Sequence, residues 1–596
     1  MAAETGRLSQ LPDSTPVVIA GGGPVGLAVA MELSHHGVAS LVIEAREKVS
    51  HLRPRAKTVS PRTMEHFRRW GVAEALRERA PLPVDWSQEA VFCTNLLGRE
   101  ITRFKACFGL ELAYSELAAE SSQQVPQPIV EELLREKVTG TDHARLVVGL
   151  RVIGAREGAD GVEVVVEDSD GRTRRIYADY LVGCEGPNSV VRAALGAAYE
   201  GSDSPRPNLS IVFRAPGLAD RVRHGPAVHY WVLDPRQPSL IGRLNLVDTW
   251  WCIAQGVDDP NTDAEQIIHR AVGATLPVEI LATDPWRARM LLADRYGSRR
   301  MFVAGDAAHQ NPPWGGHGFN TGIGDAVNLG WKLAAVLNGW APRDLLRSYE
   351  AERRPIAART IDEAAANMST LAPELADPQL FCDDRDFERL RLRLAETIHT
   401  SKDSEFHSLP LTLGYSYRDS PIVWFADGST STPGGAVGAD SPVSKERVYR
   451  PTAAPGHRLP HRWLVPGVSL YDRLGSGFTL VGDTAAPTAS TLLDAAHHFR
   501  VPMTTLHLDG LGWREAFGAA LVLVRPDQHV AWRGDRADDP AAIMRRAIGW
   551  SLKNCASLTM SARTGDHRRG AFSLARIMNA TSGPYGGTDR WADGGL

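Results

Sequence analysis

Residues 16–44, PVVIAGGGPVGLAVAMELSHHGVASLVIE, limit the fold of this chain more than any other stretch. The apolar, β-branched run at 16–20 is typical of a strand that is buried on both faces of a parallel sheet. Pro24 suits the first turn of a helix, where its missing N–H has no partner to lose, and Gly37 suits the residue after the helix end. A second apolar run follows at 41–43. This order predicts a βαβ unit of an α/β fold.

The turn of this unit has the spacing of a dinucleotide-binding site. Gly21 permits the tight turn, Gly23 lets a pyrophosphate approach the backbone, and Gly26 lets the helix pack on the strand. The helix N-terminus offers free N–H groups and a partial positive charge to the phosphates. Glu44 ends the second strand, where a carboxylate can accept a hydrogen bond from a ribose hydroxyl. An acid at this place disfavours a 2′-phosphate, so the turn predicts FAD or NAD.

Composition bounds the remaining possibilities. At 596 residues the chain is long enough for two or three domains. A net charge of −4, with both signs mixed along the chain, favours neither a nucleic-acid partner nor an anionic membrane surface, since both select a basic face. We expect no signal peptide and no membrane-spanning helix, because no apolar run is long enough. Six scattered cysteines without a CxxC pair favour a reducing cytoplasm.

Three further stretches favour FAD over NAD, because FAD makes contacts along a longer part of the chain. Residues 180–192, YLVGCEGPNSVVR, predict a strand, a turn and a helix that starts near Ser189. Residues 301–306, MFVAGD, predict another buried strand, which ends in Gly-Asp. After the glycine-rich segment that follows, a helix is predicted from Asp325.

That glycine-rich segment, GDAAHQNPPWGGHGFNTGIGDAVNLGWKL at 305–333, allows three interpretations: a metal site, an acid/base cluster, or a loop that lies against a flat, electron-poor ring. Its aspartates and histidines lack a compact ligand pattern, so we predict no metal. A glycine loop that opens a helix presents N–H donors and a positive dipole end to the negative charge of a reduced flavin. We therefore interpret the segment as a flavin-binding loop.

These motifs, together with RPRAKTVSPRTMEHFRRWG at 53–71 and VPQPIVEELL at 125–134, resemble the FAD-dependent aromatic hydroxylases of the p-hydroxybenzoate and phenol hydroxylase type. The resemblance covers most of residues 15–360. It implies an α/β fold with an FAD-binding Rossmann-like domain of the GR2 type, an inserted β-sheet substrate domain and a C-terminal thioredoxin-like domain. The implied bounds are 1–80, 112–190 and 285–370 for the FAD-binding domain, 81–111 and 191–284 for the substrate domain, 371–455 for a helical linker, 456–560 for the thioredoxin-like domain and 561–596 for a flexible tail.

The resemblance also implies residue roles. It places Arg55 near the flavin pyrophosphate, Gln127 near the isoalloxazine ring and Asp306 at the ribityl chain. Pro313 and residues 315–320 are implied to line the flavin ring. The full set of predicted FAD-binding residues is Gly21, Gly23, Pro24, Gly26, Glu44, Ala45, Arg46, Arg55, Gln127, Asp306, Pro313, Gly316, Gly318, Phe319 and Asn320.

Two residues depart from the family pattern. Glu185 stands where relatives usually have Asp, and it either makes the same contact after a small shift or alters cofactor exchange and nicotinamide access. Trp314 is bulkier than the residue common in relatives, and it either narrows the pocket and stacks on a substrate ring or packs under the loop.

The middle of the chain has short strand-like runs, which in relatives form a sheet over the flavin. Our candidates for the substrate pocket are Tyr230, Trp231, Trp314 and His317, although side chains alternate between the two faces of a strand. No second GxGxxG unit occurs, so the resemblance implies that NAD(P)H binds transiently as electron donor. Arg53, Arg55 and Arg62 are candidates for its phosphates or for those of FAD.

Near the C-terminus, residues 520–524 and 529–533 predict a hairpin with Pro526 and Asp527 in the turn. The resemblance implies a thioredoxin-like domain at this place, but without CxxC it has no dithiol chemistry. We expect it to act in packing or in subunit contact, and a homodimer is one such arrangement.

The function implied by the resemblance is hydroxylation of an aromatic phenolic or polyketide-like substrate by NAD(P)H and O₂, through a flavin C4a-hydroperoxide. No catalytic base can be assigned. Two alternatives remain open: Baeyer–Villiger insertion of oxygen into a polycyclic aromatic polyketide, and a flavin-binding scaffold without turnover.

Overall fold

The computed structural model describes residues 4–5, 8–259, 261–370, 372–382, 384–424, 448–508 and 512–550. All of them belong to the first of the two compact units of the chain, residues 1–552. The predicted tail at 561–596 lies outside the described residues, as do residues 425–447 of the predicted linker and 551–560 of the predicted thioredoxin-like domain.

The first sheet contains the βαβ unit that the sequence predicts. Its strands are β1 (Glu4–Thr5), β2 (Ser14–Ala20), β3 (Ser40–Glu44), β8 (Ala144–Val148), β9 (Arg151–Glu157), β10 (Val162–Glu167), β11 (Thr173–Gly183) and β17 (Met301–Val303). The order is β1-β8-β3-β2-β11-β10-β9, with β17 paired to β11. β10 pairs antiparallel with both β9 and β11, and the other pairings are parallel. The predicted strands at 16–20 and 41–43 are confirmed as parts of β2 and β3.

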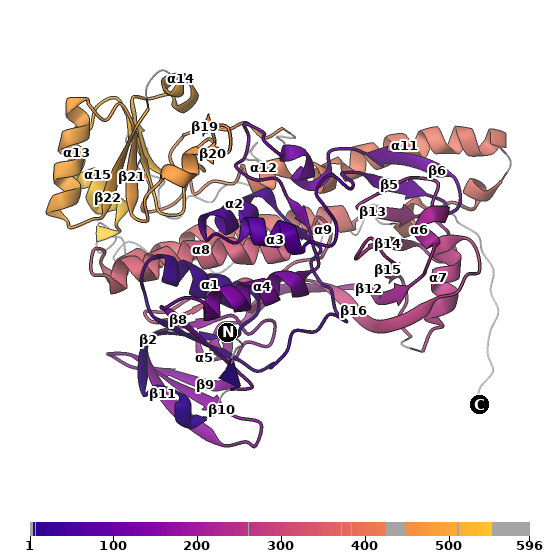
Figure 1. The fold of residues 1–596 in the computed structure, drawn as a ribbon, viewed down its shortest axis with the longest axis horizontal. Helices are drawn as coiled ribbons and strands as arrows, with labels where there is room; N and C mark the ends of the chain where they lie inside the picture. Colours follow the sequence, from indigo (N-terminus) through magenta and orange to yellow (C-terminus); the bar gives the residue numbers. More distant parts are fainter. Residues whose placement is uncertain are drawn as a thin grey trace, which may run out of the picture. The chain divides into compact units, whose positions relative to one another are not determined.

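Helices α1 (Pro24–His35), α4 (Gln127–Thr139) and α8 (His317–Leu337) lie on one side of this sheet (Figure 1). Glycines inside α8 let it approach α1 closely. A Cβ on Gly322 would lie 2.6 Å from Cγ2 of Val25, and one on Gly330 would lie 2.6 Å from Cγ of Glu32. The prediction that this helix begins at Asp325 is therefore wrong: it begins at His317, because these glycines serve helix packing and not a loop.

The second sheet, largely antiparallel, supplies the broad aromatic surface of the molecule. Its strands are β5 (Ala90–Cys93), β6 (Glu100–Phe104), β12 (Tyr199–Arg214), β13 (His229–Val232), β14 (Ser239–Arg243), β15 (Thr249–Gln255), β16 (Glu279–Ala293) and β18 (His309–Gln310). The order is β18-β16-β12-β15-β14-β13-β5-β6, and only the β5/β13 pair is parallel. The predicted domain boundary at 284/285 falls inside β16.

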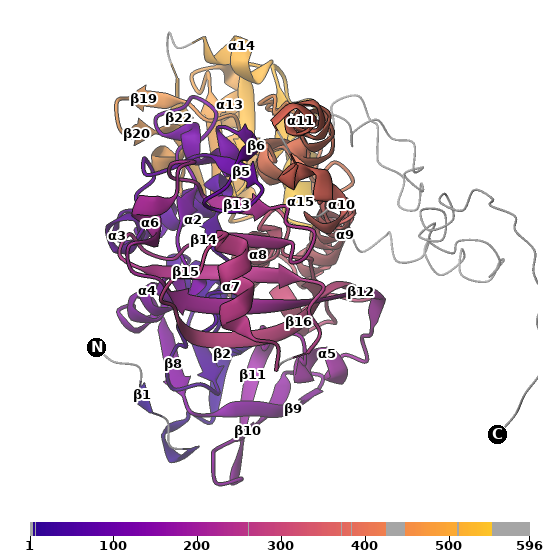
Figure 2. The ribbon, with the colours of Figure 1, turned by 90° about the vertical axis from the view of Figure 1, so that its right-hand side faces the viewer.

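The two faces of the second sheet pack against different elements. One face, with Ile211, Tyr230 and Trp250, packs on α7 (Ala264–Val272), which lies in front of the sheet in Figure 2. The other face forms an aromatic cluster with the glycine-rich loop and with α11 (Asp384–Phe406). This cluster includes Phe92, Trp231, Trp251 and Trp314. Alternation along β13 and β15 thus sends adjacent aromatic residues to opposite sides.

The third sheet lies near the C-terminus and has the order β22-β21-β23-β24. Its elements are β21 (Phe478–Gly482), α13 (Pro487–His498), β22 (Met503–His507), α14 (Trp513–Phe517), β23 (Leu521–Val524), β24 (Val530–Gly534) and α15 (Pro540–Ala547). The predicted hairpin is confirmed as β23 and β24. Trp331 of α8 packs on this sheet beside Phe478. The thioredoxin-like character of this region stays a prediction.

The turn of the β23–β24 hairpin inserts charged and amide groups into a buried network. Arg525 contacts Glu352 at 2.6 and 2.9 Å and Asp527 at 2.6 Å. Arg62 donates to the side chain of Gln528 at 2.5 Å and to the carbonyl of Asp527 at 2.7 Å. Desolvation by burial would raise the pKa of Glu352, but the charges of Arg525 and Lys332 outweigh it and lower that pKa to about 2. Ionised groups therefore hold the hairpin against α2 (Pro61–Arg69) and α9 (Ser348–Met368), which carry Arg62 and Glu352.

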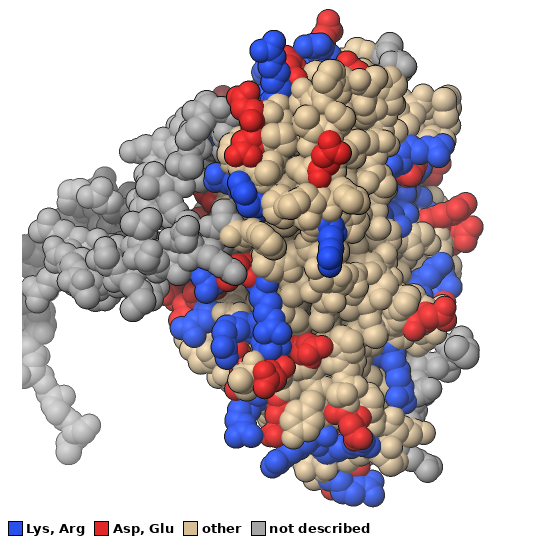
Figure 3. Space-filling model, turned by 90° about the vertical axis from the view of Figure 1, so that its left-hand side faces the viewer, with Lys and Arg blue, Asp and Glu red and all other residues tan. Residues whose placement is uncertain are grey.

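The remaining elements connect these three sheets. They are η1 (Leu8–Gln10), β4 (Thr58–Val59), α2 (Pro61–Arg69), α3 (Ala73–Arg79), η2 (Cys107–Leu112), β7 (Gln123–Gln124), α5 (Val190–Ala194), α6 (Leu218–Arg221), η3 (Gly305–Ala307), η4 (Arg343–Arg347), α9 (Ser348–Met368), α10 (Ala372–Leu375), η5 (Pro378–Phe381), α12 (Leu409–Thr412), β19 (Trp463–Val465), β20 (Val468–Ser469) and η7 (Leu470–Arg473). On the face in Figure 3, acidic and basic side chains are interspersed. Within the described ranges, no helix is long and apolar enough to cross a membrane.

Candidate cofactor and substrate site

In the N-terminal glycine turn, Gly26 packs closely against Gly21, whereas the space beside Gly23 is open. A Cβ on Gly26 would lie 1.9 Å from the carbonyl oxygen of Gly21, and Gly21 itself has a φ of +97°. A Cβ on Gly23 would meet nothing within 4 Å. Gly23 is also the N-cap of α1, and no side chain from the described ranges caps this helix end. Free N–H groups thus face a space beside the backbone, which is the arrangement that binds phosphates.

Glu44 holds the edge of this turn. Its carboxylate accepts hydrogen bonds from the Gly22 N–H at 2.7 Å and from the Arg46 N–H at 2.9 Å. The Arg46 side chain adds Nε to the same carboxylate at 2.8 Å and reaches Glu131 at 3.0 Å. Ala45 and Arg46 are exposed beside it. The structure thus brings the predicted ribose-binding acid next to the glycine turn.

The loop at 53–57 lies between this turn and the second sheet. The Gln127 N–H donates to the carbonyls of Ala56 at 2.9 Å and of Pro54 at 3.2 Å, so Gln127 and Arg55 are brought together. Arg55 is exposed, and its backbone has a φ of +45°, which is unusual for a residue other than glycine.

Asp306 is exposed, yet it is surrounded by enough protein for desolvation to raise the pKa of its carboxyl, while His309 and Arg55 act in the opposite direction. An exposed side chain amid dense protein is the mark of a concave site. The turn that carries Asp306 is fixed from behind, because the Arg192 side chain donates to the carbonyl of Ala307 at 3.1 Å and the Tyr199 hydroxyl donates to the carbonyl of Asp306.

A buried cluster that the sequence did not reveal supports the same turn. Asp325 accepts hydrogen bonds from the Gly305 N–H at 3.1 Å and from Arg353 Nε at 2.8 Å, and it lies 2.8 Å from His309 Nε2. Desolvation would raise the pKa of Asp325, but Arg353 and His309 outweigh it and lower that pKa. The one available signal was Asp325 itself, an acid inside an apolar helix, which we interpreted as a helix start.

The glycine-rich loop ends in a second uncapped helix N-terminus. Gly316 has a φ of +69°, its N–H donates to the carbonyl of Pro313 at 3.0 Å, and no described side chain caps α8. A Cβ on Gly316 would meet nothing within 4 Å, and one on Gly318 would approach only Asn311. Phe319 is half-buried in the first turn of α8. Residues 317–320 are therefore helical, which corrects the expectation that they form a loop.

Asn320 ties this helix end to the N-terminal region. Its side-chain oxygen accepts from the Ser60 N–H at 2.9 Å and from the Thr63 hydroxyl at 2.8 Å, and its amide donates to the carbonyl of Gly316 at 2.8 Å. Asn320 thus fixes the position of the helix end through its side chain, and it leaves the N–H groups of α8 free for a ligand.

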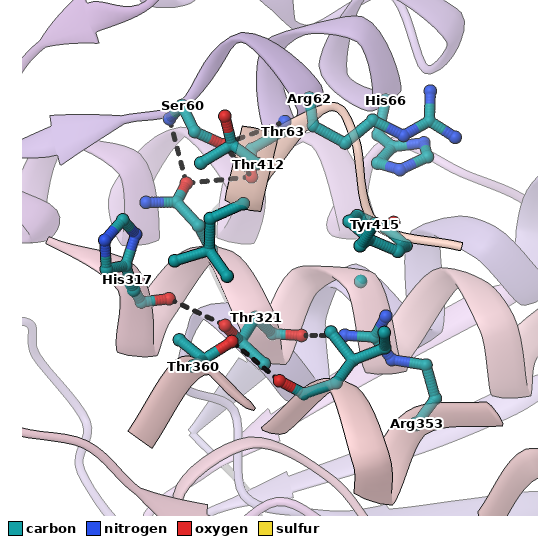
Figure 4. A pocket seen from close by; sticks show the side chains of 14 residues that line it. Ser60, Arg62, Thr63, His66, His317, Thr321, Arg353, Thr360, Thr412 and Tyr415 are labelled. Atoms are coloured by element: carbon teal, nitrogen blue, oxygen red, sulfur yellow. Dashed lines mark hydrogen bonds between the residues drawn. The ribbon is translucent and has the colours of Figure 1, made fainter. Parts of the chain in front are cut away.

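Behind this helix end lies a cavity of about 30 Å³, large enough for one or two water molecules. In Figure 4, His317 lies across the cavity from Tyr415 and His66. His317 is buried, its Nε2 has no hydrogen-bond partner among the described residues, and desolvation lowers its pKa to about 4. The imidazole is therefore neutral at neutral pH.

The four residues predicted for the substrate pocket do not all lie on the same face of the second sheet. Trp231 and Trp314 belong to the aromatic cluster, where Trp314 lies 6.0 Å from the ring of Trp286. Tyr230 points to the opposite face of the sheet, where its hydroxyl donates to the carbonyl of Gly225 at 2.5 Å. The structure thus places Tyr230 away from the other candidates.

Two of the three arginines considered for phosphates are engaged elsewhere. Arg62 is buried in the network of the C-terminal hairpin, so the expectation that it binds a phosphate is wrong. Arg53 pairs with Asp284 of β16 at 3.0 Å.

Glu185 accepts from the Ser189 hydroxyl at 2.8 Å and from the Val191 N–H at 3.0 Å, so it caps α5. No group of three metal-binding side chains occurs in the part of the chain that the structure describes.

These features fit FAD. The open cradle at Gly23 and the uncapped end of α1 suit its diphosphate, and the uncapped end of α8 suits the pyrimidine edge of a flavin. The class that the fold and site define is thus an α/β protein that binds a flavin dinucleotide.

Comparisons with known proteins identify the family. Residues 14–364 match the model of the FAD binding domain family, and residues 452–550 match that of the aromatic-ring hydroxylase C-terminal family. An FAD-dependent monooxygenase (apdD) of Emericella nidulans is 31% identical over 90% of this chain and 91% of its own length. A 2,4-dichlorophenol 6-monooxygenase of Delftia acidovorans is 30% identical over 90% of this chain and 98% of its own. The solved structure of the rebeccamycin biosynthetic enzyme RebC with reduced flavin matches with a TM-score of 0.80 and 34% identity, over 90% of this chain and all of that one.

The chain belongs to the family of FAD-dependent aromatic-ring hydroxylases. It is an FAD-dependent monooxygenase that acts on an aromatic substrate, and NAD(P)H is the usual electron donor of this family.

Proposed function

We propose that the enzyme inserts one atom of O₂ into the ring of a phenolic or polyketide-like substrate that lies between the α8 N-terminus and the aromatic face of the second sheet. The observation that carries this proposal is the position of the 53–57 loop. Its backbone is tied to Gln127 at the FAD-binding region, and its side chains reach Asp284 and Trp251 of the second sheet. The cofactor region and the aromatic face therefore adjoin each other.

The residues of the chain bind, orient and exclude water, while bound FAD supplies the activation of O₂ and the oxygen transfer. The α1 N-terminus and Gly23 would hold the diphosphate, and Glu44 would accept from the ribose. Asp306 would accept from the ribityl chain, and the N–H groups of α8 would donate to the pyrimidine edge. The aromatic face would exclude water from the reacting ring.

The purified holoprotein tests this function. NAD(P)H oxidation, O₂ uptake and product mass are measured with simple phenols and with polycyclic phenols. We expect one oxygen atom gained per NAD(P)H oxidised, with the rings intact. Lactone formation would instead indicate Baeyer–Villiger insertion, and tight binding without O₂ uptake would indicate a scaffold. A comparison of NADH with NADPH identifies the donor.

The proposed role of Glu44 has its own test. We expect Glu44→Gln to weaken FAD binding about tenfold, because a charged hydrogen bond to the ribose and the anchor of the Gly22 N–H both weaken. Equilibrium binding of FAD to the apoprotein measures this. The control is Glu47→Gln, which removes a nearby exposed carboxylate. Equal losses in both variants would contradict the assigned role.

We also propose a homodimer and a cytoplasmic location. Light scattering during gel filtration tests the first. The free thiols of Cys93, Cys107, Cys184, Cys252 and Cys382 are consistent with a reducing compartment.

A further inference from the structure

The loop at 53–57 carries a positive charge that no described carboxylate offsets. The Lys57 ammonium donates to the carbonyl of Arg55 at 2.9 Å and lies 4.4 Å from the centre of the Trp251 ring. Arg53, on the same loop, is paired with Asp284 at 3.0 Å, so the one nearby acid of β16 is already taken. Desolvation lowers the pKa of Lys57 to about 8, and no acidic group among the described residues acts against it. Two of its three N–H donors have no acceptor within the part of the chain that the structure describes.

Other unpartnered polar atoms lie around this ammonium. The indole N–H of Trp251 is buried and has no acceptor among the described residues. His229 is buried as well, its Nε2 has no partner there, and its ring lies 6.3 Å from that of Trp251. Lys57 lies near enough to lower the pKa of His229, although desolvation is the larger cause. That pKa is about 3, so His229 is neutral and can donate through one ring nitrogen.

Buried donors rarely go without acceptors, because each one costs the free energy of its lost hydration. Here three side chains from β13, β15 and the 53–57 loop leave donors unused on the face that adjoins the cofactor region. A ligand that binds on this face would supply the missing acceptor, and an unpaired ammonium selects a negative one. The ligand expected on this aromatic face, beside the cofactor region, is the ring that is to be oxidised.

We propose that Lys57, Trp251 and His229 form a subsite for an anionic oxygen of the aromatic substrate, either a carboxylate or an ionised phenol. The substrate class narrows accordingly to acidic aromatic compounds. The subsite rests on the proposed function for its place beside the cofactor, but it makes its own prediction about binding, which needs no turnover.

Three probes with the same naphthalene ring system test the subsite on the holoenzyme: 2-naphthoate, its near-isostere 2-naphthamide, and 1-naphthol. Dissociation constants follow from the change in flavin absorbance and from the quenching of tryptophan fluorescence. We expect the wild type to bind 2-naphthoate about tenfold more tightly than 2-naphthamide if the subsite takes a carboxylate. If it takes a phenolate, bound 1-naphthol shows the absorption of the ionised form at neutral pH.

In Lys57→Met we expect the preferred anion to lose about tenfold in affinity, or the phenolate absorption to disappear, while 2-naphthamide binds within about twofold of the wild type. Lys57→Arg should retain most of the preference. Lys48→Met, which removes an exposed charge nine residues earlier in the chain, is the matched control. The FAD content of each variant shows whether the loop is intact.

Two results would overturn the proposal: a wild type that does not distinguish the probes, and a Lys57→Met variant that loses affinity for NADPH instead of for the anion. The second result would assign Lys57 to a nucleotide phosphate. Oxygenation that persists without any dependence on Lys57 removes the subsite and leaves the proposed function standing. Anion binding that depends on Lys57, without O₂ uptake, would support the subsite and contradict the proposed function.

Discussion

Gly26→Ala is expected to give a protein that no longer retains FAD. Alanine favours a helix interior over glycine by about 1 kcal/mol. That gain is outweighed, because the added Cβ would lie 1.9 Å from the carbonyl oxygen of Gly21, a backbone atom that cannot move without opening the turn. Overpacking of this kind costs about 3 kcal/mol, which corresponds to about a hundredfold loss of FAD affinity if the turn shifts. Absorbance of the purified protein and FAD titration measure it.

Gly23→Ala is expected to weaken FAD binding without changing the stability of the fold. Gly23 has a φ of −74°, which alanine adopts freely, and its Cβ would meet no protein atom within 4 Å. This variant should melt like the wild-type apoprotein, yet bind FAD at least about tenfold more weakly, since the methyl group takes the place of the phosphates. Normal FAD binding by Gly23→Ala would show that the diphosphate lies elsewhere.

Arg525→Met is expected to lower the free energy of unfolding by about 3–5 kcal/mol, because it leaves the buried carboxylates of Glu352 and Asp527 without their main partner. Urea titration, followed by far-UV circular dichroism and by flavin fluorescence, measures the loss. We expect both signals to move to lower urea, since Glu352 lies beside Arg353, which holds the Asp325 cluster behind the flavin turn.

The control for this prediction is Arg514→Met. Arg514 also pairs with an acid of the C-terminal region, Asp535 at 3.2 Å, but both side chains are more than half exposed. Exposed ion pairs contribute little to the free energy of unfolding. The urea midpoint of Arg514→Met should therefore change no more than is usual for a surface substitution. Similar shifts in both variants would mean that the buried network does not carry the stability assigned to it.

The sequence predicts local geometry well where a residue and its partner are close in the chain. The βαβ unit is such a case, because Gly21 and Gly26 contact each other across a single turn. The hairpin of β23 and β24 is another, since its register depends on the turn between its strands. The position of Glu44 at the end of β3, beside the same glycine turn, could be predicted for the same reason.

Prediction failed where the partner is distant in sequence. The glycines of α8 suggested a loop, because their partners Val25 and Glu32 lie about three hundred residues earlier. Arg62 suggested a phosphate ligand, because its partner Gln528 follows 466 residues later. The side of the sheet to which Tyr230 points depends on strand register, which alternation alone does not fix.

The attachment of the β23–β24 hairpin has a consequence for biosynthesis. A ribosome makes the N-terminal glycine turn first, yet Arg62 and Glu352 receive Gln528 and Arg525 only after the last part of the chain has emerged. Until then Arg62 and Glu352 have only the partners that the earlier chain supplies, Glu65 and Lys332, so the buried network stays incomplete until synthesis is nearly finished. We therefore expect stable uptake of the cofactor to be a late event, and a chain that stops before residue 525 to stay colourless.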